Sequence, residues 1–129
     1  FSNTLVDDRG NVWLIDPRGT FGSTKIYGDK RYDWAKFYYS ASGNYDSINS
    51  KQFKVSVISD YVNLEIKSNG YEVMSDYIIS RSGMSKKEML LINATIWLSL
   101  TGYVKEDIDA AMYAFYKGCE LWTEAFSQT

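Results

Sequence analysis

The chain of 129 residues contains no histidine and only one cysteine, Cys119. The lack of histidine excludes a Ser-His-Asp or Cys-His catalytic site within this chain. The lack of a second cysteine excludes an intrachain disulfide, and a zinc site built from Cys and His ligands is excluded as well. A metal bound here must therefore have oxygen ligands, which points to magnesium or a similar hard cation.

Long hydrophobic runs and clustered positive charge are lacking too. The longest apolar segment, 89–100, is interrupted by Asn93, Thr95 and Ser99 and is shorter than the roughly 20 residues of a membrane span. The net charge is −2 and the basic residues are scattered, so the chain has no electrostatic footprint for nucleic acid. We expect neither a membrane nor nucleic acid as a partner, and the low cysteine content fits a cytoplasmic location.

Length and composition suit one domain over residues 1–129. Hydrophobic residues make up 45% and charged residues 23%, an ordinary globular balance. Eleven tyrosines are present, and because each buried phenol needs a polar partner, we expect polar core edges or a wet groove. Five tyrosines either line such a groove, where a substrate would bind, or pack in the core, and most are expected to pack. They are Tyr38, Tyr39, Tyr103, Tyr113 and Tyr116.

Periodicity and turn residues predict an α+β fold, with small hairpins first and a helical body second. Strand patterns predict hairpins over 4–16 and 53–67, and the strand before Asp16 is expected to be buried. Helix patterns predict helices over 30–41, 71–81, 86–102 and 106–126. Asp29 is the expected N-cap of the first helix, and Ser85 with Glu88 forms a capping box for the third. Residues 17–28 and 42–50 are expected to be loops.

The last predicted helix carries a large apolar stripe, spaced four, three, four, three and four residues apart. Its members are Ile108, Met112, Phe115, Cys119, Trp122 and Phe126. We expect this stripe to face the core, and Cys119 to serve there as a packing residue rather than a redox group.

One pair of oxygen-bearing side chains suggests a cation-binding site. Asn3 opens the first predicted strand and Asp16 closes the second, so a hairpin would bring them together. An amide oxygen and a carboxylate could then face one cation, as phosphoryl transfer requires. Taken alone, an Asp after a strand is more often a turn former. The glycines after Asp16 would let the backbone approach a phosphate closely.

The surrounding residues resemble a known family. FSNTLVDDRGNVWLIDPRG is similar to the second half of the catalytic segment of the aminoglycoside phosphotransferase and choline kinase-like proteins, small-molecule relatives of protein kinases. Their segment reads H-G-D, four residues, Asn, a short hairpin and an Asp after an apolar strand. YGDKRYDWAKF then resembles their G-D-x-x-Y-D-L-A-K segment, and the matching residues are Gly28, Asp29, Tyr32, Asp33, Ala35 and Lys36.

The resemblance implies a protein-kinase-like C-terminal lobe with specific site residues. Asn3 and Asp16 would be the Mg²⁺ ligands for ATP, and Asp33 would brace the catalytic loop by accepting backbone N–H hydrogen bonds. Arg18 could contact a phosphate or an anionic substrate, although an arginine here is more often a surface ion-pair residue. The family's general base lies five residues before its Asn, which places it upstream of Phe1.

Several departures from the family qualify this expectation. The nucleotide-clamping N-terminal lobe and the H-G-D segment are missing, and Pro17-Arg18-Gly19 replaces the Phe-Gly of protein kinases. The chain begins with Phe1 rather than Met, so we expect a piece of a longer protein that is inactive alone. We expect that the face toward the missing lobe is partly apolar and self-associates.

The resemblance implies that the parent protein is an ATP- and Mg²⁺-dependent phosphotransferase acting on a hydroxyl of a sugar or amino alcohol. The wording of the motifs is most similar to bacterial members associated with capsule or surface-polysaccharide synthesis. One alternative is a pseudokinase-like binding module that performs no chemistry. Another is a helical interaction domain with a chance hairpin motif, which would place Asn3 and Asp16 more than about 8 Å apart, too far to share one Mg²⁺.

Overall fold

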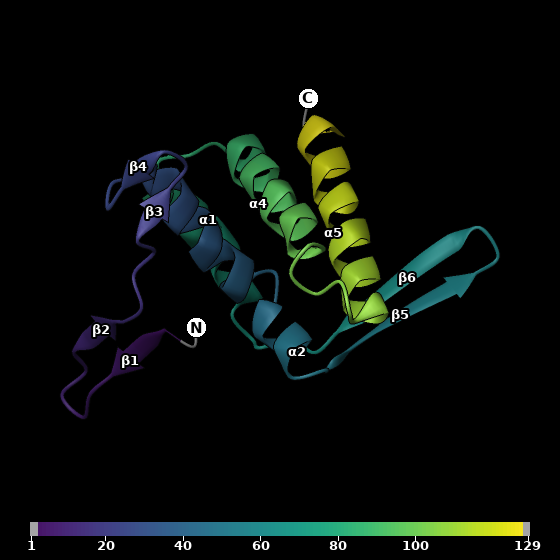
Figure 1. The fold of residues 1–129 in the computed structure, drawn as a ribbon, viewed down its shortest axis with the longest axis horizontal. Helices are drawn as coiled ribbons and strands as arrows, with labels where there is room; N and C mark the ends of the chain where they lie inside the picture. The colour runs from purple at the N-terminus through teal and green to yellow at the C-terminus, as the bar shows by residue number, and fades with distance from the viewer. Residues whose placement is uncertain (1–2, 128–129) are drawn as a thin grey trace.

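The computed structural model describes residues 3–127 and has the expected α+β fold class. Helices form the body of the molecule, and antiparallel two-stranded hairpins lie around it (Figure 1). In chain order the elements are β1 (Thr4–Val6), β2 (Val12–Leu14), β3 (Thr20–Phe21), β4 (Thr24–Lys25), α1 (Lys30–Ala41), α2 (Tyr45–Asn49), β5 (Phe53–Ile58), β6 (Tyr61–Ile66), the 3-10 turn η1 (Glu72–Met74), α3 (Ser75–Ser82), α4 (Lys86–Leu100) and α5 (Ile108–Ser127). Within the described residues, no helix is long and apolar enough to span a bilayer.

The core lies around α4, which packs against α5 on one side and α1 on the other (Figure 1). Trp97 of α4 is its centre and is 0% exposed. The rings of Tyr39 and Tyr113 lie 4.6 Å and 5.6 Å from the ring of Trp97, centroid to centroid. Edge and tilted aromatic contacts of this kind add to the stabilisation from burial. The Trp97 Nε1 donor is buried without a hydrogen-bond partner among the described residues, which lowers the net gain from burying this ring.

The expectation that the large apolar stripe of α5 faces the core was wrong. Phe115, Trp122 and Phe126 are each about half exposed, and Cys119 is exposed as well. The buried face of α5 consists instead of the small residues Ala110, Ala114, Gly118 and Ala125, together with Tyr113 and Leu121.

Close helix packing explains which face of α5 is buried. A Cβ added at Gly118 would lie only 2.6 Å from Leu98 Cγ and 3.2 Å from the Ala94 carbonyl oxygen. Small side chains let two helix backbones approach, whereas the large aromatic stripe would hold them apart. The helical periodicity predicted one large apolar stripe on α5 and did not reveal that the face with the small residues packs on α4.

The first hairpin, β1–β2, is exposed along its whole length, so the expectation of a buried strand before Asp16 was also wrong. Trp13 is 61% and Leu14 80% exposed. In Figure 1 this hairpin lies apart from the helical body. Because the residues of both strands are exposed, burial contributes little to this hairpin, and its β-forming sequence favours the pairing.

The second predicted hairpin agrees with its alternating pattern. Phe53, Leu64 and Ile66 pack against the core while Lys54 and Glu65 point to solvent. The pairing of Phe53 with Ile66 and of Val55 with Leu64 places these apolar side chains on one face, which contacts α5.

Both segments expected to be loops contain regular structure. Residues 17–28 hold the short β3–β4 hairpin, in which the Thr24 hydroxyl donates to the carbonyls of Phe21 or Tyr27. Residues 42–50 hold α2, preceded by the buried Asn44 in a left-handed conformation. The Asn44 side chain donates to Glu72 and accepts from the Asn69 backbone, which joins α2 to the turn before η1. Short elements that are held by side-chain hydrogen bonds show little hydrophobic periodicity in the sequence, so the pattern did not predict them.

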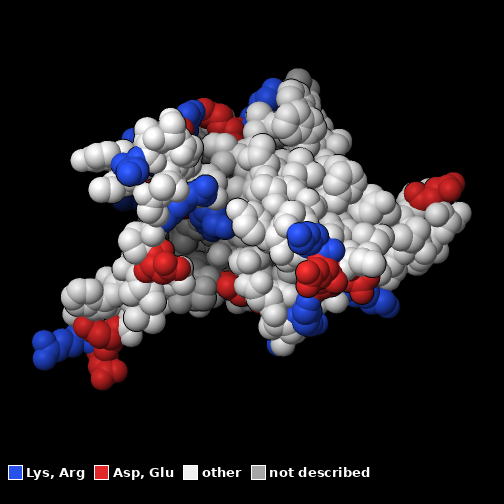
Figure 2. All heavy atoms as spheres, in the orientation of Figure 1, with Lys and Arg blue, Asp and Glu red and all other residues white. Residues whose placement is uncertain are grey.

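Charged residues of both signs are distributed over the visible face of the molecule (Figure 2). A hollow between the β1–β2 hairpin and the helical body has Lys and Arg atoms above it and Asp or Glu atoms beside it (Figure 2).

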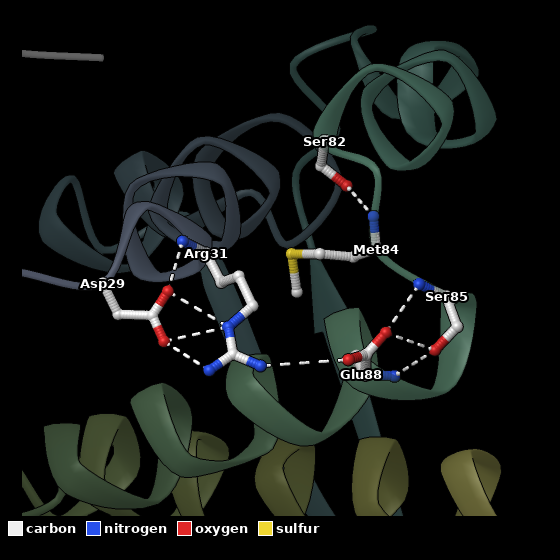
Figure 3. A network of polar contacts seen from close by, with 6 residues as sticks. All are labelled: Asp29, Arg31, Ser82, Met84, Ser85 and Glu88. Atoms are coloured by element: carbon white, nitrogen blue, oxygen red, sulfur yellow. Dashed lines mark hydrogen bonds and ion pairs between the residues drawn. The ribbon is translucent and has the colours of Figure 1, made fainter.

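The predicted helix caps are confirmed and are linked to each other (Figure 3). Asp29 accepts from the Arg31 backbone N–H at 2.9 Å, and Ser85 and Glu88 cap α4 reciprocally. The Arg31 guanidinium pairs with Asp29 and reaches Glu88 at 3.9 Å, so the starts of α1 and α4 are joined. The hydrogen bonds from Arg31 also lower the pKa of Asp29.

Because Tyr113 is buried, we expect the protein to lose stability at alkaline pH. Burial raises the pKa of Tyr113 to about 12, whereas an unfolded tyrosine titrates near 10. Above pH 10 the unfolded chain releases a proton that the folded protein keeps, so the free energy of unfolding falls by up to about 1.4 kcal/mol per pH unit. Urea unfolding between pH 9 and 11 should show this slope reduced in Tyr113→Phe and unchanged in Tyr103→Phe, whose side chain is exposed. Equal slopes in all three proteins would contradict the assignment.

Candidate metal and anion site

The first hairpin brings Asn3 and Asp16 to the same end. Thr4 pairs with Leu14, and the backbone N–H of Ile15 donates to the Asn3 carbonyl at 3.0 Å, one residue beyond the strand ladder. Asn3 Nδ2 then lies 3.5 Å from Asp16 Oδ2. A half-turn of the Asn3 amide would direct Oδ1 to the same point as the carboxylate. This spacing lies within the limit of about 8 Å for two ligands of one Mg²⁺.

Asp16 has an unusual backbone. Its φ of 54° is left-handed, although it is followed by Pro17, which favours an extended residue before it. Asp tolerates this region better than most residues, yet such conformations cost on the order of 1–3 kcal/mol and gather at functional sites. The turn ends the strand and places the exposed Asp16 carboxylate beside Asn3.

The donor set fits a magnesium ion held partly by a substrate. Among the described residues, no group of three or more His, Cys, Asp or Glu side chains could hold a metal. Mg²⁺ does not need such a cage, since it is commonly held by one or two carboxylates together with waters and substrate phosphates. One carboxylate from Asp16 and one amide oxygen from Asn3 fit that second pattern.

Arg18 is held in a defined position. Its Nε donates to the Thr20 carbonyl at 2.8 Å and its Nη1 donates to the Tyr32 hydroxyl at 2.9 Å. The guanidinium carbon also lies 5.1 Å from the Tyr32 ring centroid, within the range of a cation–π contact. Within residues 3–127 it forms no ion pair, so it differs from the surface ion-pair residue that was the ordinary expectation.

Asp33 lies in the first turn of α1 and is exposed. The catalytic-loop residues that it would brace precede Phe1 in the family pattern. Its role as a support for that loop therefore stays a prediction.

A cleft of about 620 Å³ includes Arg18, two residues after Asp16, among its lining residues, and sequence reasoning predicted only part of it. Its walls come from four parts of the chain: residues 18–22, one face of α1, Tyr45 of α2, and the end of α4 with Tyr103. Two of the five tyrosines considered for a cleft, Tyr39 and Tyr103, line it, while Tyr113 packs in the core.

Lys36 is the most important cleft residue that we did not predict as part of the site. Its ammonium lies 4.4 Å from the Tyr39 ring centroid and 5.6 Å from that of Tyr45. Partial burial of the ammonium lowers the pKa of Lys36, and the charge of Arg18 lowers it further. The spacing of Tyr32, Lys36 and Tyr39 along α1 was the available sequence signal, because residues three and four apart share one helix face.

Comparison with known proteins adds no relative: no protein-family model matches the chain, and neither a curated protein nor a solved structure matches it.

Proposed function

We propose that this chain is the C-terminal lobe of a bacterial ATP- and Mg²⁺-dependent phosphotransferase with a protein-kinase-like fold. It would act on a hydroxyl group of a sugar or amino alcohol, in the synthesis of capsule or another surface polysaccharide. The observation that carries the proposal is the 3.5 Å approach of Asn3 to Asp16, at the end of a hairpin whose sequence resembles the catalytic segment of small-molecule kinases.

In this proposal Asn3 and Asp16 hold Mg²⁺ through their side-chain oxygens. The chemistry that Mg²⁺ would supply there is stabilisation of the negative charge that develops during phosphoryl transfer. The turn at Asp16 keeps the carboxylate at the end of the hairpin. Catalysis of phosphoryl transfer depends mainly on such positioning and on electrostatic stabilisation. The aspartate that accepts the proton of the attacking hydroxyl would lie upstream of Phe1, so this chain alone would not catalyse transfer.

The first hairpin supports the proposed contact with an N-terminal lobe. Val6, Trp13 and Leu14 are more than half exposed, and an apolar surface of this kind is typical of an interaction site. In the absence of that lobe, the same surface would favour self-association of the chain.

Metal binding to this chain can be measured directly. Paramagnetic Mn²⁺, added with ATP, should broaden the amide NMR signals around Asn3 and Asp16 before other signals, and excess Mg²⁺ should reverse the effect. Asp16→Asn removes the ligand charge and should abolish the selective broadening. Asp8→Asn, at the opposite end of the same hairpin, is the matched control and should behave like the unaltered chain. Broadening that persists in Asp16→Asn would contradict the proposed metal site.

A further inference from the structure

The cleft that includes Arg18 is lined by two cationic residues and by no acidic residue. Arg18 and Lys36 line it together with tyrosines, small polar residues and apolar residues, and no Asp or Glu is among its lining residues. Its volume of about 620 Å³ lies within the range of roughly 300–1,000 Å³ that small-molecule sites occupy. The cleft therefore suits a small ligand that carries negative charge.

The two cations have no carboxylate partner. No ion pair within residues 3–127 includes Arg18 or Lys36. They are also close enough that the charge of Arg18 lowers the pKa of Lys36. Two like charges at one cleft repel each other, and a bound anion would remove that repulsion.

Both cationic groups are held in place before any ligand arrives. Hydrogen bonds to Thr20 and Tyr32 use two donors of the Arg18 guanidinium, which has five, so the others remain for a ligand. The Lys36 ammonium rests on the faces of Tyr39 and Tyr45. Side chains that are already ordered lose less conformational entropy on binding, which favours affinity.

We propose that this cleft binds a monosaccharide-sized ligand through a phosphate or carboxylate group, with Arg18 and Lys36 as the anion contacts. The guanidinium suits planar, multiple hydrogen bonding to either anion, and the ammonium adds a point charge. Tyr45 and Tyr103, which are not buried, would supply flat walls for the sugar ring. The assignment of this cleft as the acceptor site of the phosphotransferase rests on the proposed function. The assignment of the cleft as an anion-binding site does not.

The bound anion could also be the triphosphate of a nucleotide, because Arg18 is only two residues from Asp16, the proposed ligand of the nucleotide's Mg²⁺. Equilibrium binding to the full chain distinguishes these sources. The probes are glucose 6-phosphate, glucuronate, neutral glucose, and ATP without Mg²⁺, each titrated by calorimetry at fixed ionic strength. We expect both sugar anions to bind at least about tenfold more tightly than glucose, as one or two charge-assisted hydrogen bonds provide.

Matched variants identify the contacts. Lys36→Met and Arg18→Gln should each weaken glucose 6-phosphate binding at least about tenfold, whereas Lys36→Arg should retain most of it. Lys54→Met and Arg9→Gln, which alter exposed residues outside the cleft, should leave binding unchanged. Circular dichroism checks that every variant is folded.

Two results would overturn the proposal. One is equal binding of glucose and the sugar anions. The other is ATP binding that depends on Lys36 and Arg18 while the sugar anions do not bind, which would make the cleft a nucleotide-phosphate site. Because no step of this test requires phosphoryl transfer or Mg²⁺, its outcome is separate from that of the Mn²⁺ experiment.

Discussion

If the proposed phosphotransferase assignment holds, Asp16→Ala should lower Mg²⁺-dependent ATP turnover by at least about a thousandfold. A bound metal ion supplies several kcal/mol of charge stabilisation in the transition state, and each 1.36 kcal/mol changes the rate tenfold. Asp16 is the only carboxylate of the proposed pair, so the amide of Asn3 would hold the cation poorly without it. The measurement is steady-state turnover with pooled sugars, sugar anions and amino alcohols, after the residues before Phe1 have been read.

The controls use the same hairpin and the same substitution. Asp8→Ala leaves the far turn of the hairpin without one carboxylate and should keep full turnover, while Asn3→Ala should lose part of it. Turnover that survives Asp16→Ala would contradict the metal assignment. No turnover in the unaltered protein, together with the absence of the upstream aspartate, would instead favour a pseudokinase-like binding module.

The sequence predicted the elements with strong local signals. Asp29, Ser85 and Glu88 cap helices as expected because a cap depends on one side chain and the backbone beside it. The β5–β6 hairpin was predicted because alternation over six residues is a clear signal. The approach of Asn3 to Asp16 follows from hairpin geometry in the same way.

Features that depend on distant contacts were missed. The orientation of α5 is determined by how closely α4 can approach Gly118, which one helix pattern cannot reveal. The α2 helix is joined to the segment before η1 by Asn44, Asn69 and Glu72, residues far apart in the sequence. Lys36 becomes a cleft residue only when Tyr45 and α4 close the other sides.

Trp97→Ala should cost about 3–5 kcal/mol of the free energy of unfolding, measured by urea denaturation. The indole is completely buried and contacts the rings of Tyr39 and Tyr113, so its removal leaves a cavity between α1, α4 and α5. This loss is a large share of the 5–15 kcal/mol that stabilises a typical domain. If the alanine variant does not fold, Trp97→Phe, which keeps one ring, should fold with an intermediate loss.

Trp122→Ala is the matched control, because it removes the same side chain from the exposed stripe of α5. Trp122 is 47% exposed and contacts Phe126 along the same helix, so its removal should cost less than about 1 kcal/mol. The contrast between the two tryptophans tests which face of α5 packs on α4, because the helix pattern predicted Trp122 to be a core residue and the structure leaves it about half exposed. A loss at Trp122 as large as that at Trp97 would mean that α5 packs with its aromatic face inward, and the small residues around Gly118 would then face solvent.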